Sequence, residues 1–230
     1  MSSSGNDGRP ESPTSLSGRS WFGVVRRTVR EFHRLYYDSS LRTWSNTFWF
    51  GTPTQKCPLD LWVYQELLHE LRPEVIVETG TASGGSALFL ASVCELLGRG
   101  EIVSVDIEER ERPSHERVTY LTGSSTAPEI AARVLEFVGD RTKVLVILDS
   151  DHTRDHVLEE LRLYSPLVDP GSYVIVEDTN INGHPVRPDF GPGPMEAVDE
   201  FLRQSPEFSI DPEREKFFLT FNPRGFLRRR

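Results

Sequence analysis

Cysteine is scarce in this sequence, because only Cys57 and Cys94 occur among 230 residues. Two cysteines so far apart supply neither a disulfide framework nor the paired spacing of a zinc site. No run of about eighteen apolar residues is present, so no membrane-spanning helix is expected. The first residues also lack the cationic and apolar pattern of a secretory signal. These absences favour a protein of the reducing cytoplasm.

An excess of basic residues is also missing, since the formal net charge is −9 at pH 7. A nucleic-acid partner is therefore not expected, because binding to phosphates needs clustered Lys and Arg. Arginines do gather locally, near the start of the chain and at residues 228–230. We interpret both groups as solvated surface or tail.

Composition divides the chain into four parts. Residues 1–20 are rich in Ser, Gly and Pro, and we expect a disordered tail because they bury too little apolar surface. Residues 21–58 combine an amphipathic helical pattern at 21–37 with an irregular aromatic segment. Residues 59–224 form the main domain, and 225–230 are expected to be a basic tail. Three roles stay open for the N-terminal helix: covering the active site, packing on the domain, or joining copies into a homo-oligomer.

Short apolar segments alternate with amphipathic ones in the main domain. This alternation predicts an α/β fold with a mostly parallel sheet and helices on both faces. The expected strands cover residues 75–78, 102–105, 118–121, 144–148, 173–176 and 217–221, and the expected helices cover 61–71, 86–97, 128–138, 154–164 and 195–202. Ligands of open parallel sheets bind beyond the carboxyl ends of the strands. Acidic residues stand where four of these strands end: Glu78, Asp106, Asp149 and Glu177.

The loop after the first strand is rich in glycine and runs Glu78-Thr-Gly-Thr-Ala-Ser-Gly-Gly-Ser86. Its glycines allow a tight turn and a close approach of a ligand to the backbone. A dinucleotide site would show G-x-G-x-x-G, and a P-loop would carry a Lys after the glycines; neither is present. The loop resembles the first motif of class I methyltransferases, which lies beneath the methionine part of S-adenosylmethionine. The resemblance implies cofactor contacts from Glu78, Gly80, Thr81, Ala82, Gly84 and Ser86.

Further cofactor contacts are expected along the same sheet edge. Asp106 ends the second strand, where a carboxylate can accept hydrogen bonds from both ribose hydroxyls; a strand-end cap is the alternative. Ser124 and Ser125 follow the third strand, where methyltransferases commonly bind the adenine edge. Asp149, at the end of the fourth strand, is also assigned to the cofactor site.

Three acids predict a metal site. Asp149 follows the fourth strand, and Glu177 and Asp178 follow the fifth. Because neighbouring strand ends converge, these carboxylates should meet, and a divalent cation would relieve their repulsion. Oxygen ligands favour Mg²⁺, or another hard divalent cation, over zinc. Asp151 is an alternative ligand, and solvated loop acids are the alternative explanation.

His152 lies three residues after Asp149. The spacing of the acids is similar to that of catechol O-methyltransferases, in which this offset carries the general base. A histidine is suited to take a proton from a hydroxyl near neutral pH. Its alternative role is to orient a metal ligand, and His156, one turn further on, is expected at the surface.

Several segments together resemble the cephalosporin hydroxylase family over residues 43–222. They are Thr47–Gly51, Pro58–Trp62, Glu78–Ser86, Leu148–Thr153, Gly171–Asn180, Gly183-His-Pro and Phe190–Ala197. The family is similar to metal-dependent class I methyltransferases and includes enzymes that methylate sugar hydroxyls such as those of rhamnose. The resemblance implies a Rossmann-like class I methyltransferase fold with a seven-stranded sheet. Nothing in the sequence identifies a β-lactam substrate.

The resemblance implies O-methyl transfer from S-adenosylmethionine to a hydroxyl of a sugar or secondary metabolite, with Mg²⁺ or a similar cation. The Pro- and Gly-rich loop at 180–194 is long enough to be functional, and we expect it in the acceptor pocket. His184 and Arg187 from this loop and Gln55 from the aromatic segment are the candidate acceptor contacts. The alternatives are a hydroxylase, as the family name suggests, and a non-catalytic partner that binds S-adenosylmethionine.

Overall fold

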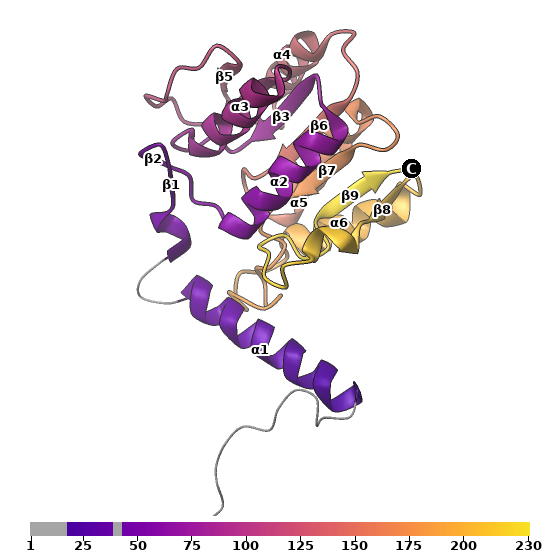
Figure 1. Cartoon of the computed structure of the whole chain (residues 1–230). Helices are drawn as coiled ribbons and strands as arrows, with labels where there is room; N and C mark the ends of the chain where they lie inside the picture. Colours follow the sequence, from indigo (N-terminus) through magenta and orange to yellow (C-terminus); the bar gives the residue numbers. More distant parts are fainter. Residues whose placement is uncertain (1–17, 39–42) are drawn as a thin grey trace, which may run out of the picture.

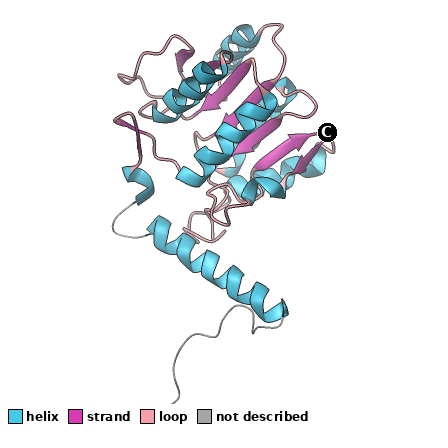
Figure 2. Ribbon diagram, viewed as in Figure 1, coloured by secondary structure: helices cyan, strands magenta, loops and turns pink. Residues whose placement is uncertain are grey.

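A single central sheet of seven strands organises the main domain. The structure is a computed structural model that describes residues 18–38 and 43–230, so the expected tail lies outside them except for its last three residues. The strand order is β5-β4-β3-β6-β7-β9-β8 (Figures 1 and 2). The strands span Val75–Thr79 (β3), Glu101–Asp106 (β4), Val118–Thr122 (β5), Val144–Leu148 (β6), Tyr173–Val176 (β7), Phe208–Ile210 (β8) and Phe226–Arg229 (β9). Strands β3 to β7 are parallel to one another, and β9 runs antiparallel to both β7 and β8.

Helices cover both faces of the sheet, as predicted. Alternate strand residues face opposite sides: Val75 and Val77 pack with one helical layer, and Ile76 packs with the other. The first layer holds α4 (Pro128–Val138), α5 (Arg154–Tyr164) and α6 (Pro194–Gln204), and the second holds α2 (Pro58–Leu71) and α3 (Gly85–Leu97). Both faces of β3, β6 and β7 are fully buried, which explains their continuous apolar sequences.

The C-terminal part of the sheet differs from the prediction in two places. Residues 217–221, expected as a strand, are not in the sheet, because Leu219 and Phe221 are buried instead against the N-terminal segment. Residues 225–230, expected as a basic tail, contain β9, in which Phe226 and Leu227 are buried. The two arginines of this strand do not need to be buried. Arg228 is exposed, and Arg229 donates to the carbonyl oxygen of Val168 at the end of the sheet.

The aromatic segment before α2 contains small ordered elements. A 3₁₀ turn, η2 (Thr43–Asn46), precedes a two-stranded hairpin of β1 (Phe48–Trp49) and β2 (Thr52–Pro53). Trp49 attaches the hairpin to α3, since its indole donates to Ser92 Oγ at 3.1 Å and its ring meets Phe89 edge-on. Two further 3₁₀ turns, η3 (Ser165–Leu167) and η4 (Pro212–Glu215), lie in the main domain.

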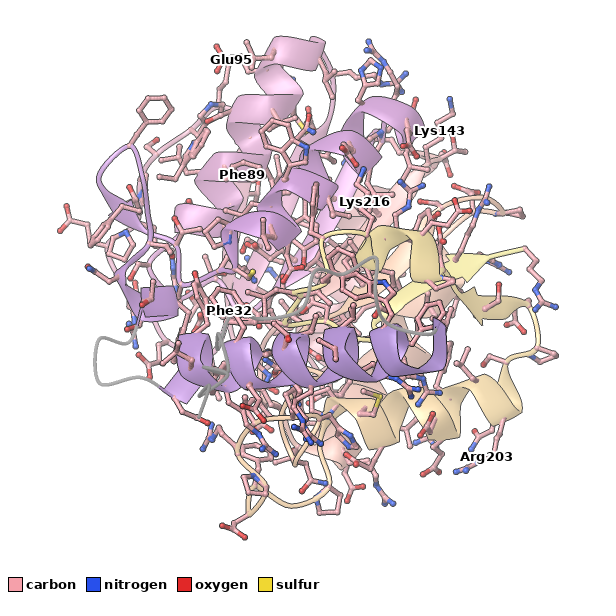
Figure 3. The ribbon with its side chains drawn as sticks, turned by 60° about the horizontal axis from the view of Figure 1, so that its bottom comes forward. Phe32, Phe89, Glu95, Lys143, Arg203 and Lys216 are labelled. Carbon is pink, nitrogen blue, oxygen red and sulfur yellow. The ribbon has the colours of Figure 1, made fainter. Side chains whose placement is uncertain are left out.

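The N-terminal helix α1 (Gly18–Asp38) crosses below the carboxyl edge of the sheet (Figures 1 and 3). Its inner face packs on the domain: the His33 ring stacks on Phe221, with 5.7 Å between centroids, and Asn180 Nδ2 donates to His33 Nε2 at 2.9 Å. Its outer face leaves Phe32 and Leu35 exposed. Packing on the domain is thus one confirmed role for α1. No helix of the described residues is long and apolar enough to cross a membrane.

Acidification should weaken the packing of α1. Burial lowers the pKa of His33 from 6.5 to about 4, so the unfolded chain binds more protons than the folded one between these values. The stability that neutral His33 contributes is complete above about pH 6.5 and is lost as the pH falls through about 4, up to about 3 kcal/mol. Thermal unfolding at about pH 7.5 and about pH 5 should show a larger loss for wild type than for His33→Phe, which retains an aromatic ring against Phe221. Equal losses would contradict this role.

Candidate active site

Two cavities lie side by side along the carboxyl ends of the strands. One of about 380 Å³ runs over the ends of β4 and β5, and one of about 320 Å³ lies over the ends of β6 and β7. They share Gly80, Asp106 and Ser150, so they adjoin, and we refer to the pair as the cleft. We name them the β4–β5 cavity and the β6–β7 cavity. Their position is the sheet edge at which parallel α/β folds bind ligands.

The glycine-rich loop separates the cleft from the core. Gly80 has a φ of +84°, and a Cβ there would lie 1.8 Å from the carbonyl oxygen of Asp149. Its amide also donates to Val105 O at 2.8 Å. Only glycine permits this backbone contact, which fixes the loop against the end of β6 and thereby positions Asp149.

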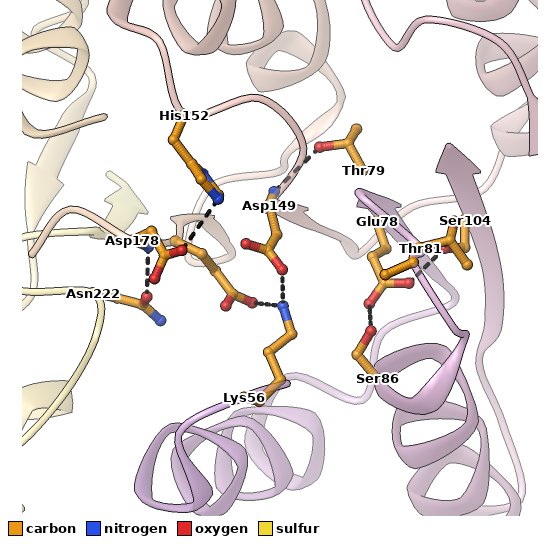
Figure 4. A network of polar contacts seen from close by, with 12 residues as sticks. Lys56, Glu78, Thr79, Thr81, Ser86, Ser104, Asp149, His152, Asp178 and Asn222 are labelled. Carbon is orange, nitrogen blue, oxygen red and sulfur yellow. Dashed lines mark hydrogen bonds and ion pairs between the residues drawn. The ribbon is translucent and has the colours of Figure 1, made fainter. Parts of the chain in front are cut away.

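Behind the loop, Glu78 is completely buried and lines neither cavity. Ser86 Oγ donates to its Oε1 at 2.5 Å, and Ser104 Oγ donates to Oε2 (Figure 4). Thr81 extends the network through Ser104, at 2.7 Å. Glu78, Thr81 and Ser86 therefore brace the loop from inside, and Gly84 forms the N-cap of α3. Of the loop residues expected to contact the cofactor, Gly80 and Ala82 line the cleft.

Asp106 lies where the two cavities meet. Its Oδ2 accepts from the amide of Ala82 at 2.7 Å, and its Oδ1 accepts from the amide of Glu108 at 2.8 Å. These bonds aim the carboxylate into the cleft. Arg112 Nη2 lies 3.6 Å from Oδ2, so Oδ1 is the oxygen that keeps a second lone pair for a ligand hydroxyl. The position agrees with the expected ribose contact.

The far wall of the β4–β5 cavity carries Ser124, Ser125 and His156. We expected His156 at the surface, but it lies in the cavity wall. Its Nε2 is 3.1 Å from Ser125 Oγ and 3.0 Å from Ser150 Oγ. The completely buried Glu160, 3.6 Å away, raises the pKa of His156. The pair could have been predicted from the sequence, because His156 and Glu160 are spaced i, i+4 on α5 and residues so spaced are neighbours on a helix.

The predicted metal acids surround a lysine that sequence reasoning missed. Lys56 Nζ donates to Glu177 Oε1 at 2.6 Å and to Asp149 Oδ2 (Figure 4). Burial alone would lower the pKa of Lys56, but the charges of Asp149 and Glu177 together raise it above its ordinary value. Burial raises the pKa of Glu177 to about 7, and Asp149 acts in the same direction.

A chain of hydrogen bonds ties these acids to the second helical layer. Tyr64 on α2 donates to Glu177 Oε1 at 2.8 Å and accepts from Asn222 Nδ2 at 2.9 Å. Asn222 Oδ1 in turn accepts from the amide of Asp178 at 3.1 Å (Figure 4). Asp178 adopts the left-handed backbone conformation, with a φ of +53°. The hydrogen bond from its amide to Asn222 holds this conformation, in which the carboxylate faces the end of β6.

His152 faces the same acids from the loop after β6. Its Nε2 lies 3.1 Å from Asp178 Oδ2. Among the residues that the structure describes, single ligand atoms of Asp149, His152 and Asp178 all lie within 4.8 Å of one another. The structure thus brings together two of the three predicted acids with His152, whereas Glu177 is held beside Lys56. Asp151 instead lines the β4–β5 cavity.

The expected acceptor contacts divide between two places. Gln55 and Arg187 line the β6–β7 cavity with Tyr37 of α1 and Trp44, so the N-terminal segment forms one wall of the site. Tyr37 stacks on Trp44 with 5.5 Å between ring centroids. His184 lies apart from this cavity, since its Nε2 is 2.9 Å from Glu196 Oε1 at the start of α6.

Lysine is rare in this sequence. The sequence contains three lysines among 26 basic residues, and they are Lys56, Lys143 and Lys216. Lys143 and Lys216 are both exposed, so the scarcity of lysine alone did not distinguish Lys56, although lysine and arginine are not interchangeable at a buried site because lysine is a compact point charge. The irregular backbone around Lys56 gave no periodicity from which its direction could be inferred.

The parallel sheet, the glycine loop at its edge and the acid after β4 define a class I methyltransferase. The chain matches the family described as Rhamnosyl O-methyltransferase/CmcI over residues 41–230 and belongs to it. This result confirms the resemblance inferred from the sequence.

Individual relatives agree with this family. The chain is 41% identical to the rhamnosyl O-methyltransferase of Mycobacterium leprae over 209 residues, which cover 88% of this chain and 90% of that protein. It is 40% identical to the Mycobacterium tuberculosis protein of the same name over 221 residues, or 93% and 89% of the two chains. The solved apo structure of CmcI superposes with a TM-score of 0.63 at 22% identity, covering 80% of this chain and 76% of that one.

The contact between Gly80 and Asp149 should be essential for stability. In Gly80→Ala, the new Cβ would overlap backbone atoms of Asp149 and Ser150, which have no room to move. We expect a loss of about 3 kcal/mol or more in the free energy of unfolding. Gly171→Ala is the matched control, because Gly171 has a φ of +91° with nothing near its Cβ position, and should lose only about 1 kcal/mol. Denaturant titration measures both; similar losses would show that the Asp149 contact adds nothing to the backbone strain.

Proposed function

We propose that this protein transfers the methyl group of S-adenosylmethionine to a hydroxyl of a sugar, in a reaction that needs a divalent cation. The observation that carries the proposal is the pair of adjoining cavities, in which a carboxylate suited to ribose lies beside the cluster of Asp149, His152 and Asp178. A methyl donor bound along the cleft would therefore end next to the acids and the imidazole.

The β4–β5 cavity fits a nucleoside. Its volume of about 380 Å³ is in the range of small-molecule sites. Asp106 would hold the ribose hydroxyls, and Ser124, Ser125 and His156 would offer polar atoms to the base. A second CmcI structure, described as holding Mg and SAM, has a TM-score of 0.63 and 23% identity with this chain.

The β6–β7 cavity fits a hard cation by the chemistry of its donors. Asp149 and Asp178 offer carboxylate oxygens beside His152, and Glu177 is the third acid in our proposal. A bound divalent cation lowers the pKa of a coordinated hydroxyl. The carboxylates would hold that cation, and burial raises the pKa of Asp149 and Asp178.

The side chains around the cavity supply the remaining steps. His152 accepts the proton of the acceptor hydroxyl, and Asp178 orients the imidazole through the contact at Nε2. Gln55 and Arg187 line the side where the acceptor enters. Much of the rate would come from holding the oxygen in line with the methyl group.

A sugar is the preferred acceptor because the relatives named above are rhamnosyl O-methyltransferases with about 40% identity over most of both chains. The polar lining from Gln55 and Arg187 suits hydroxyl groups. Two alternatives are less favoured. A hydroxylase would need two histidines and one carboxylate around its iron, whereas this cluster has one histidine and two carboxylates. A non-catalytic binding partner would not need His152 beside the acids.

Methyl transfer should depend on the cation and on Asp149. Purified protein should transfer labelled methyl from S-adenosylmethionine to rhamnosylated acceptors, chelation should stop the reaction, and Mg²⁺ should restore it. Asp149→Ala removes a ligand and should abolish measurable turnover, whereas Asp155→Ala, which changes an exposed acid of α5, should retain it. Full activity of the chelated protein or of Asp149→Ala would refute the metal-dependent reaction.

Substitution of His152 separates its two roles. As a general base, His152→Ala should lower kcat by roughly 10²–10⁴-fold while the affinity for Mn²⁺ stays within about twofold. As a ligand or a group that orients Asp178, it should lower the Mn²⁺ affinity together with kcat. Isothermal titration with Mn²⁺ beside the kinetic assay decides between them, and unchanged kcat would remove His152 from the reaction.

Other expectations from the sequence stay predictions. They are the cytoplasmic location, the absence of a nucleic-acid partner and self-association. The exposed stripe of α1, formed by Trp21, Val24, Phe32 and Leu35, is where self-association would occur.

A further inference from the structure

Lys56 is built into the acid cluster more firmly than a surface lysine could be. Only 4% of its side chain is exposed. Its backbone is held by Thr47, whose Oγ1 accepts from Lys56 N at 3.3 Å and donates its one proton toward Trp44 O at 3.0 Å, with Lys56 O further away at 3.4 Å. The ammonium therefore reaches the acids from a clamped segment directly before α2.

The ammonium occupies one oxygen of each acid that it contacts, Asp149 Oδ2 and Glu177 Oε1. Tyr64 donates to the same oxygen of Glu177, and His152 faces Oδ2 of Asp178. Within residues 18–38 and 43–230, no hydrogen bond engages the second oxygen of any of these three carboxylates. Each acid thus keeps one oxygen for another ligand while the other oxygen is held.

Lys56 also lowers the negative charge that a bound cation would meet. Three carboxylates, Asp149, Glu177 and Asp178, carry three negative charges when ionised, and Lys56 supplies a positive charge in contact with two of them. Arg187 adds a positive charge from the wall of the β6–β7 cavity. Glu78 and Asp60 are also buried, but they have partners of their own: both oxygens of Glu78 accept from Ser86 and Ser104, and Asp60 Oδ2 accepts from the amide of Phe221.

We propose that Lys56 is a permanent positive member of the metal site and sets its preference for divalent over trivalent cations. The lysine positions Asp149 and Glu177 and reduces the charge that the bound cation meets. This inference rests on the metal dependence proposed above.

Replacement of Lys56 should change the charge selectivity of the site. In Lys56→Met the site gains one negative charge, and a trivalent ion responds to it more strongly than a divalent one, since Coulomb energy scales with the product of the charges. The ratio of the Mn²⁺ and Tb³⁺ dissociation constants should rise roughly tenfold or more. Calorimetry with Mn²⁺ and luminescence with Tb³⁺, both at the same pH, measure the two constants.

Two matched variants control for lost geometry. Lys56→Arg retains the charge, so the ratio should stay near the wild-type value even if both affinities fall. The double variant Lys56→Met/Glu177→Gln restores the net charge and should restore the ratio. Thermal unfolding followed by circular dichroism confirms that each variant is folded.

The outcomes separate this inference from the proposed function. Wild type that binds no Mn²⁺ would overturn both. Wild type that binds Mn²⁺, with an unchanged ratio in Lys56→Met, would overturn only the role of Lys56. An equal gain for both ions in Lys56→Met would also overturn it, because the lysine would then merely occupy the place of the cation.

Discussion

Several carboxylates converge at one end of the sheet, and their mutual repulsion is the constraint on which the site depends. Removing such charges from water is unfavourable unless each has a fixed partner. Lys56, Tyr64 and His152 provide these partners from three separate segments. The site is therefore also a tertiary contact, because it ties the aromatic segment, α2 and the loop after β6 to the ends of two central strands.

The cleft combines two kinds of support. Its floor is made by strand ends and a glycine loop, whose positions follow from the register of β3, β4 and β6. Its outer wall comes from α1 and the aromatic segment, where Tyr37 and Trp44 stack. The floor is rigid because both faces of these strands are buried. The outer wall rests on fewer contacts, among them His33 on Phe221, so in the proposed reaction acceptor specificity and cofactor binding would depend on different parts of the chain.

The sequence predicted those parts of the fold in which local pattern and burial agree. Strands β3, β6 and β7 are continuous apolar runs because both of their faces are covered, so their positions and the acids after them could be inferred. Strand β9 could not, because its short pattern places two apolar residues before two arginines. The apolar residues around Leu219 and Phe221 were misassigned, since they pack against α1, a contact that no local periodicity encodes.

The candidate site divides in the same way. Asp106, Asp149 and Asp178 follow strands and were found by position, whereas Lys56 and Tyr37 reach the cleft from irregular or distant segments. Glu78 showed the opposite difficulty: it ends a strand as expected, yet its carboxylate turns inward to two serines. A strand-end acid can therefore bind a ligand or brace a loop, and only the contacts of the folded chain distinguish these roles.

The position of β9 between β7 and β8 bears on how the protein matures on the ribosome. Strand β8 precedes β9 in the chain but has no other partner in the sheet. During synthesis, β8 therefore cannot pair with the sheet until β9 has been synthesised. Asn222, which connects Tyr64 to Asp178, lies just before β9 and is therefore also synthesised late. The last strand pairing of the sheet and the contacts of Asn222 with Tyr64 and Asp178 thus form at the same stage. The acid cluster therefore obtains these contacts only when the sheet is complete.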